Sequence, residues 1–297
     1  MGYINIFVSS YCKLSLDSNG LILSGEKEAR FAIEDINCVM VDNLQCSVSI
    51  SLLSRLAKEG VAVFVCDQKH IPTAILMPYG QYFAHLRVFR LQTQVKKPLV
   101  KQMWQSIISR KIANQAECLR LNGKREGAEK LFALSQTVLS DDTTNLEATA
   151  ARIYFKELFG KDFDRRSDNG TNACLNYGYA IVRGLIARTL AARGFSVFLG
   201  IHHASELNAF NLADDFIEPY RAIVDRTVSK FSLSTLDNNA KKLLFNLNNA
   251  DVSIDNTNQV LPRSIEICID SYMTSLEQGV NKLKLPIMQE IKSHEYL

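Results

Sequence analysis

Short apolar runs rich in β-branched residues mark the first quarter of the chain. Runs of this length, bounded by turn-forming residues, are typical of strands. Between residues 49 and 58 the apolar positions recur instead with the spacing of one helix face, and Gly60 is suited to end that helix. The pattern predicts a small antiparallel β domain over residues 1–79. The apolar runs fall at 4–8, 14–16, 21–23, 38–41, 61–65 and 75–77.

The strand pattern stops at the Pro-Tyr-Gly sequence at 78–80, where we place a domain boundary. Beyond it the apolar positions recur mostly with helical spacing, and breaks are predicted near Pro98 and Gly123. A stretch rich in asparagine and aspartate at 246–259 is expected to be a loop. The predicted fold class is therefore α+β, in which a larger all-α domain at residues 80–297 follows the β domain.

The composition is that of an ordinary globular protein, since 47% of its 297 residues are hydrophobic and allow a sizeable core. The formal net charge of +3 is too small to indicate a nucleic-acid partner by itself. Seven scattered cysteines without a Cys-x-x-Cys pair argue against a zinc ribbon and a disulfide framework. No signal-peptide pattern or membrane-length apolar run occurs, so we expect a cytoplasmic protein without a membrane partner.

Positive charge is concentrated between Arg87 and Lys130, a segment with eleven lysines or arginines against three glutamates. Such a run is commonly just a solvated face. The alternative is a surface that follows DNA phosphates, because each basic side chain near a phosphate releases counterions and adds affinity for any sequence. Trp104, within the same segment, is expected to pack in the core. The candidate phosphate-contacting residues are Arg87, Arg90, Lys96, Lys97, Lys101, Arg110 and Lys111.

Two adjacent imidazoles, His202 and His203, stand shortly before a cluster of carboxylates. In that cluster Asp215 and Glu218 are three positions apart, which puts them on one face of a helix. An imidazole and carboxylate oxygens together suit a divalent cation. Acidic residues near a helix start also favour the helix dipole, and an isolated histidine is more often a packed or exposed side chain. The spacing alone leaves both interpretations open.

Thr144 and Glu147 stand at the start of another predicted helix, with the spacing of a capping box. In a capping box the glutamate side chain reaches back to the first amide of the helix and satisfies it. That structural role would by itself account for Glu147.

Several of these residues resemble the signature of the CRISPR-associated integrase family, the first Cas protein. The similarity lies in Gly200-Ile-His-His203, Leu212, the run 215–221 and Asp225. The helix that opens with Glu147-Ala-Thr-Ala-Ala-Arg and the Asn176-Tyr177 pair are also similar to the family pattern. Asn211, where serine usually precedes the leucine, and the few glycines after His203 resemble the type II branch of the family.

The resemblance implies a metal-dependent DNA endonuclease and integrase that inserts spacer DNA into a CRISPR array, the adaptation stage of antiviral defence. The reaction would be a phosphoryl transfer in which a 3′-hydroxyl attacks a phosphodiester. Asp215 would be a further catalytic residue beside the metal, and His202 and Arg221 would join the candidate DNA contacts. The implied catalytic ligands of Mg²⁺ or Mn²⁺ are Glu147, His203 and Glu218.

The resemblance also implies partners. These are double-stranded DNA, as the prespacer and as the CRISPR repeat, and a second copy of the chain in a homodimer formed through the N-terminal β domain. The second Cas protein, a small ferredoxin-like adaptation partner, is implied too, with other type II adaptation proteins and the effector nuclease as further candidates. Two alternatives remain: a structure-specific DNA nuclease without an integration role, and a non-catalytic DNA-binding scaffold.

Overall fold

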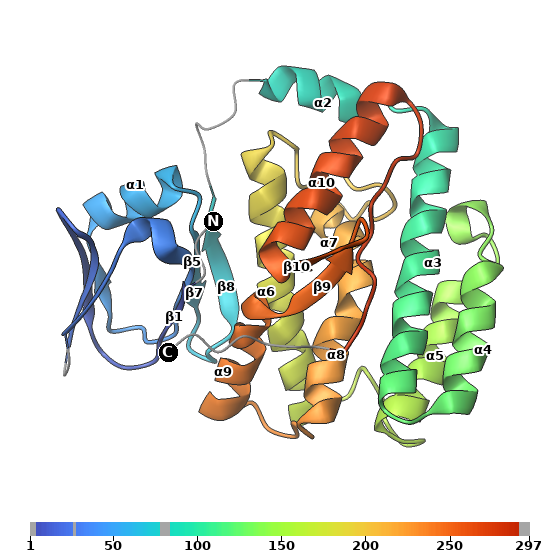
Figure 1. Ribbon diagram of the computed structural model, residues 1–297, viewed down its shortest axis with the longest axis horizontal. Coiled ribbons are helices and arrows are strands. Elements are labelled where there is room, and N and C mark those ends of the chain that lie inside the picture. Colours follow the sequence, from blue (N-terminus) through green and yellow to red (C-terminus); the bar gives the residue numbers. More distant parts are fainter. Residues whose placement is uncertain (1–3, 26–27, 78–83, 291–297) are drawn as a thin grey trace.

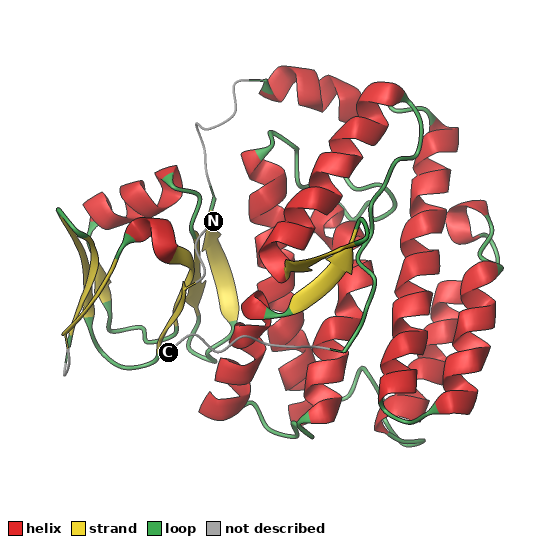
Figure 2. Cartoon of the chain, viewed as in Figure 1, coloured by secondary structure: helices red, strands yellow, loops and turns green. Residues whose placement is uncertain are grey.

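The computed structural model describes residues 4–25, 28–77 and 84–290, with strands in the N-terminal part and mainly helices in the rest (Figures 1 and 2). This order confirms the predicted strand-rich region followed by a largely helical one. The boundary predicted at 78–80 lies outside the described residues. The N-terminal elements are β1 (Ile4–Val8), β2 (Lys13–Asp17), β3 (Gly20–Ser24), β4 (Glu28–Phe31), β5 (Ile36–Val41), β6 (Ser47–Val48), α1 (Ile50–Lys58), β7 (Ala62–Cys66) and β8 (Pro72–Leu76).

These strands form two mixed sheets, so the prediction of a purely antiparallel domain was wrong. In the first sheet, ordered β1-β5-β7-β8, the pairs β1–β5 and β5–β7 are parallel and β7–β8 is antiparallel. In the second, ordered β4-β3-β2-β6, the β2–β6 pair is parallel. The physical reason is the helix α1 between β5 and β7, because a helical crossover returns the chain in the same direction. Gly60, with φ of 73°, follows this helix as predicted.

Strand β5 is buried along its whole length, because it has packed neighbours on both faces. Cys38 and Met40 belong to the core shared with the helices, whereas Val39 and Val41 belong to a second core with α1 and the other sheet. A strand covered on both faces has a continuous apolar sequence rather than an alternating one. The first sheet is therefore the layer that joins the two parts of the molecule.

The helical part packs around the long helices α3 and α6 (Figure 1). Within the described residues no helix is both long and apolar enough to cross a bilayer. The elements are α2 (His85–Thr93), α3 (Lys97–Leu121), α4 (Arg125–Gln136), α5 (Leu146–Phe159), α6 (Gly170–Ala192), α7 (Asn211–Ile217), α8 (Arg221–Lys230), α9 (Asn238–Phe245), β9 (Asp251–Ile254), β10 (Thr257–Val260) and α10 (Leu261–Gln278).

The stretch 246–259 contains a β-hairpin, so both the predicted loop and the all-α description of this part were wrong. Strands β9 and β10 pair antiparallel through a two-residue turn, Asp255-Asn256, whose φ angles are 50° and 61°. Asparagine and aspartate tolerate this left-handed conformation and favour tight hairpin turns. Val252 and Ile254 are buried and alternate with polar residues, which is the strand pattern that the polar composition concealed.

Helices α6 and α9 bind the first sheet through polar as well as apolar contacts. The Tyr177 hydroxyl lies 3.0 Å from the sulfur of Met40, and Lys241 on α9 forms a buried ion pair of 3.3 Å with Asp42 at the end of β5. A lysine or aspartate buried at such a junction is stable only when it is paired. These contacts fix the sheet against the helices that carry the site.

Candidate active site

Glu147 lies in the first turn of α5, but it does not cap the helix. The amides of Leu146 and Glu147 donate to the Asp142 carboxylate at 2.9 and 3.0 Å. The Asn145 side chain accepts the amide of Ala148 at 3.4 Å as the N-cap. The predicted capping box was therefore wrong, because other side chains satisfy these amides. The Glu147 carboxylate remains available for another partner.

That partner is Lys111 on the long helix α3. Its Nζ lies 2.5 Å from Glu147 Oε1 and 2.5 Å from Glu218 Oε2, although only 7% of the lysine is exposed. Because both oxygens are 2.5 Å from the same nitrogen, they lie no more than 5.0 Å apart. Lys111 thus brings together two carboxylates that are far apart in the sequence.

Glu218 is buried in a 3₁₀ turn, Glu218–Tyr220, between α7 and α8. Its Oε1 accepts a hydrogen bond of 2.9 Å from Arg221 Nε. Burial acts to raise the pKa of this carboxyl, but Arg221 and Lys111 outweigh it and lower the pKa to about 2. The group is therefore ionised at neutral pH. Its Oε2 lies 2.5 Å from Lys111 Nζ, so the lysine ammonium is the partner of this oxygen in the structure.

Asp215 on α7 is fully buried and organises the histidine loop. Its carboxylate accepts the backbone amides of Ile201, His202 and His203 at 2.5, 3.2 and 3.1 Å. It also lies 2.7 Å from His203 Nδ1. When that nitrogen donates its proton to Asp215, Nε2 is the free acceptor of the ring. The hydrogen bond to Asp215 raises the pKa of His203, an effect that burial opposes but does not cancel.

Gly200 allows the loop to approach Asp215 this closely. A Cβ atom at this position would lie 2.2 Å from the carbonyl oxygen of His203 and 2.8 Å from Asp215 Oδ2. Both distances are shorter than any real contact, so a side chain here would displace the loop.

The ring of Trp104 on α3 packs against the imidazole rings of both His202 and His203. Its buried ring stacks on His202, with centroids 4.2 Å apart and planes 2° apart, and meets His203 edge-on at 5.8 Å. The two imidazole planes differ by 89°, so the adjacent histidines present their rings in different orientations. Trp104 is a packing residue, as predicted, but the rings that it packs against are those of the candidate site.

Arg221 packs against a buried hydrogen-bond network formed by Asp225, Tyr154 and Tyr179. Asp225 accepts hydrogen bonds from the hydroxyls of Tyr154 and Tyr179, the former at 2.9 Å. Burial raises the pKa of the Asp225 carboxyl to about 6, although both hydroxyls favour its ionised form. The Arg221 guanidinium lies 4.7 Å from the centre of the Tyr179 ring. The network therefore supports the arginine that holds Glu218, a role for the tyrosines that the sequence pattern did not reveal.

Comparisons with known proteins show the family to which the chain belongs. The sequence profile of the family described as CRISPR associated protein Cas1 matches residues 6–243. Over the full length of both proteins, the chain is 35% identical to the CRISPR-associated endonuclease Cas1 of Neisseria meningitidis serogroup C. The chain belongs to the Cas1 family. This confirms the resemblance seen in the motifs around Glu147, His203 and Glu218.

Solved structures share the fold of this Cas1 family member. A casposase bound to its integration product matches with a TM-score of 0.77 at 19% identity, over 95% of this chain and 92% of that one. A chain of a Cas6-RT-Cas1–Cas2 complex matches with a TM-score of 0.69 at 17% identity, over 97% of this chain and 36% of that one.

The candidate DNA contacts divide into two groups in this Cas1 fold. Arg90 on α2 is exposed, and so are Lys96 and Lys97 at the start of α3. Arg87 and Lys101 pair instead with Glu277 and Asp141 at 2.6 and 3.2 Å. His202 is partly exposed above Trp104. Lys111 and Arg221 instead point into the protein as the ion-pair partners of Glu218. Lys111 and Arg221 therefore contact a carboxylate of the candidate active site and are not positioned on an outer surface that could bind DNA phosphates.

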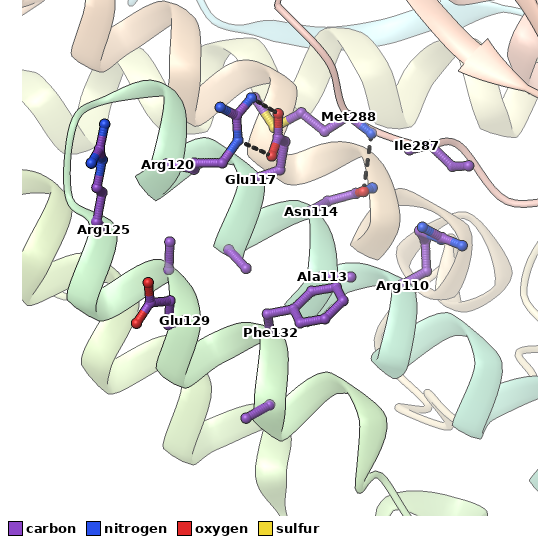
Figure 3. Close-up of a pocket in the computed structure, with 13 residues that line it drawn as sticks. Arg110, Ala113, Asn114, Glu117, Arg120, Arg125, Glu129, Phe132, Ile287 and Met288 are labelled. Carbon is purple, nitrogen blue, oxygen red and sulfur yellow. Dashed lines mark hydrogen bonds and ion pairs between the residues drawn. The ribbon is translucent and has the colours of Figure 1, made fainter.

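Arg110, the neighbour of Lys111, lines a separate groove of about 840 Å³ between α3, α4 and the segment around Met288 (Figure 3). Figure 3 shows Arg120 paired with Glu117 and the exposed ring of Phe132 on the opposite wall. None of the carboxylates or histidines of the candidate active site lines this groove. Arg110 and Lys111 are consecutive in the sequence, but Arg110 lines this groove and Lys111 lies in the candidate active site.

The donor types around Lys111 suit Mg²⁺ or Mn²⁺, which bind carboxylate oxygens and also accept imidazole. Glu147 and Glu218 are within 5.0 Å of each other, and Nε2 of His203 is an acceptor when Nδ1 donates its proton to Asp215. As the side chains stand, no three His, Cys, Asp or Glu among the described residues are close enough to hold a metal ion together. The ammonium of Lys111 occupies the space between the two glutamates.

Proposed function

We propose that this Cas1 family member is a metal-dependent DNA endonuclease and integrase that inserts spacer DNA into a CRISPR array. The observation that carries the proposal is the approach of Glu147 and Glu218 to one point, from α5 and from the turn between α7 and α8. The ring of His203 is oriented by the buried Asp215 and is close enough to Glu218 for that carboxylate also to raise the pKa of the imidazole. An N. meningitidis relative that is named an endonuclease supports the assignment.

In integration, a 3′-hydroxyl oxygen forms a bond to a backbone phosphorus while the bond to the leaving 3′-oxygen breaks. The proton of the attacking hydroxyl is lost, and the leaving oxygen gains one. A bound divalent cation would neutralise the charge that develops on the phosphate. Glu147, Glu218 and His203 would hold this cation through two carboxylates and the free imidazole nitrogen. Asp215 then acts as a positioning residue, because it fixes the tautomer and direction of His203.

The surrounding residues keep Glu218 ionised for this task. Arg221 binds one oxygen of Glu218 and, together with Lys111, lowers its pKa to about 2. Glu218 would therefore be ionised, as a metal ligand must be, over the whole physiological pH range. The carboxylates and the imidazole fit either Mg²⁺ or Mn²⁺.

The proposed substrate is double-stranded DNA, as the prespacer and as the repeat. Exposed basic residues at the start of α3, namely Lys96 and Lys97, would contact its phosphates, with His202 closer to the site. We further propose that residues 1–79 form the dimerisation domain and 80–297 the catalytic domain of a homodimer. The Cas1–Cas2 composition of a structural relative supports the second Cas protein as a partner. The type II branch, with its other adaptation proteins and effector nuclease, remains a prediction.

A strand-transfer assay tests the proposal. Purified protein, with its Cas2 partner, is incubated with a target duplex that contains the repeat and with labelled prespacer DNA ending in a 3′-hydroxyl. A matched prespacer ends in a 2′,3′-dideoxynucleotide and therefore lacks the 3′-hydroxyl that would attack the target. Joined products are expected from the first prespacer alone and only when Mg²⁺ or Mn²⁺ is present. Cleavage of DNA without joining would instead support a structure-specific nuclease and overturn the integrase assignment.

A further inference from the structure

Lys111 is an ion-pair partner of Glu218 in the site described above, but the proposed metal chemistry gives its ammonium no role once a cation is bound. It extends from the middle of α3 and is 7% exposed, and it lies at ion-pair distance from two glutamates that arise from different elements. A surface lysine would keep its ammonium in water, because losing hydration is unfavourable unless a charged partner replaces it. The burial of Lys111 is thus explained by the two carboxylates.

The two carboxylates in turn need a positive charge between them. Like charges at this separation destabilise each other, most strongly where water is excluded. Glu218 has a second partner in Arg221, at 2.9 Å. Among the described residues, the ion-pair partner of Glu147 is Lys111. Removing the ammonium would leave the Glu147 carboxylate without this compensation.

A divalent cation bound to both glutamates would need the same space. Oxygen ligands surround Mg²⁺ or Mn²⁺ at about 2.0–2.4 Å, and the Lys111 nitrogen already lies 2.5 Å from Glu147 Oε1 and Glu218 Oε2. The ammonium and such a cation cannot both be bound there. Lysine has a flexible four-carbon stem, so its head group can move away while the helix remains in place.

We propose that Lys111 is an internal counter-ion that holds Glu147 and Glu218 together in the metal-free protein and is displaced when a divalent cation binds. The inference rests on the proposed function, since it takes both glutamates as metal ligands. Two consequences follow. The ligands are assembled before the metal arrives, and the displacement of Lys111 weakens the affinity for the metal.

The test is a titration of Mn²⁺, followed by the loss of the free-ion EPR signal, into wild type, Lys111→Met and Lys111→Arg. Methionine has a similar length and helix propensity but no charge, so it no longer competes for the glutamates. We expect Lys111→Met to bind Mn²⁺ roughly ten-fold or more tightly than wild type. Lys111→Arg, which keeps the charge, should stay within about three-fold of wild type.

Thermal melts of the same proteins give a second readout. Without metal, Lys111→Met should melt at a lower temperature than wild type, and saturating Mn²⁺ should raise its melting temperature by more. The matched control is Lys130→Met, because Lys130 also pairs with a glutamate, Glu126, but on the exposed face of α4. Its Mn²⁺ affinity and its response to Mn²⁺ should equal those of wild type.

The outcomes are distinguishable. If Lys111→Met binds Mn²⁺ no more tightly than wild type, the counter-ion inference is overturned while the proposed site survives. If wild type and Glu218→Gln bind Mn²⁺ equally, the site itself is wrong, and with it the proposed function. Should Lys111→Met fail to fold, Lys111→Gln serves the same test, since it leaves a neutral hydrogen-bond donor between the glutamates and should also bind Mn²⁺ more tightly.

Discussion

The role of Asp215 gives a prediction with a calculable magnitude. Its Oδ2 accepts the amides of Ile201 and His202, and its Oδ1 accepts the amide of His203 and faces the ring Nδ1. In Asp215→Asn, one of these oxygens becomes an NH₂ group that cannot accept. If Oδ2 is replaced, the amides of Ile201 and His202 lose their acceptor; if Oδ1 is replaced, the amide of His203 loses it, while the ring can change tautomer and accept from the new NH₂ group. The substituted side chain would also carry no charge.

A donor that loses its partner costs about 1–3 kcal/mol, so one or two of them predict a loss of about 1–6 kcal/mol in the free energy of unfolding. For a chain of this length, such a loss lowers the melting temperature by up to about 15 °C. The matched control is Asp214→Asn at the adjacent position. Asp214 bonds Asn208 at 2.6 Å and lies 3.8 Å from Arg183. Because an amide can replace the first contact, we expect a loss under about 1 kcal/mol.

The assay is urea unfolding of wild type and both variants, followed by tryptophan fluorescence. Trp104 is the single tryptophan of the sequence, and its ring stacks on His202, so its emission reports directly on the histidine loop. Asp215→Asn should unfold at lower urea and should have altered native emission, whereas Asp214→Asn should resemble wild type. If Asp215→Asn and Asp214→Asn unfold at the same urea concentration and both have wild-type emission, Asp215 neither anchors the loop nor orients the His203 ring.

Three further predictions concern the loop, the buried network and the DNA surface. Gly200→Ala should lower the melting temperature by several degrees, because its Cβ would overlap a carbonyl oxygen at 2.2 Å, and an unchanged melt would refute the close approach. Burial raises the pKa of the Asp225 carboxyl from 3.8 to about 6. The folded state therefore holds this proton more tightly than the unfolded state does. The free energy of unfolding should fall, by at most about 3 kcal/mol, as the pH rises from about 4 to about 6. Asp225→Asn should abolish that trend in melts across this range, and a trend that persists would assign it to other groups. Neutralising Lys96 and Lys97 together should reduce the slope of log affinity against log salt by about two in DNA-binding titrations, and an unchanged slope would mean that neither contacts phosphate.

The sequence pattern predicted the strand-rich and helical parts because that signal is local. It did not predict the pairing directions, although the helix at 50–58 between two apolar runs indicated a parallel pair. The hairpin at 251–260 was missed for a related reason, since an Asp-Asn turn and a long loop have the same polar composition. Strand direction and hairpin pairing depend on contacts between segments, and the residue pattern of one short segment carries no information about those contacts.

For the site, the motif spacing brought His203 and Asp215 together correctly, because they are near each other in the sequence. The approach of Glu147 to Glu218 depends on how α3 packs against α5 and the α7–α8 turn, and no local pattern carries that information. Lys111 is the clearest case. A charge count treats it like Arg110, yet Lys111 lies between the carboxylates of Glu147 and Glu218, whereas Arg110 lines a groove between α3 and α4. Only the three-dimensional packing separates the two residues.

The most direct test of the central claim is strand transfer by Glu147→Gln, measured beside its melting temperature and with saturating Mg²⁺ and Mn²⁺. Asp142 and Asn145 satisfy the amides at this helix start, so the substitution leaves the cap intact. Glu157→Gln, at an exposed position of the same helix, is the matched control. We predict that Glu147→Gln loses strand transfer by orders of magnitude in both cations while its melting temperature changes by only a few degrees. Strand transfer equal to that of Glu157→Gln in both cations would contradict the assignment of Glu147 as a metal ligand.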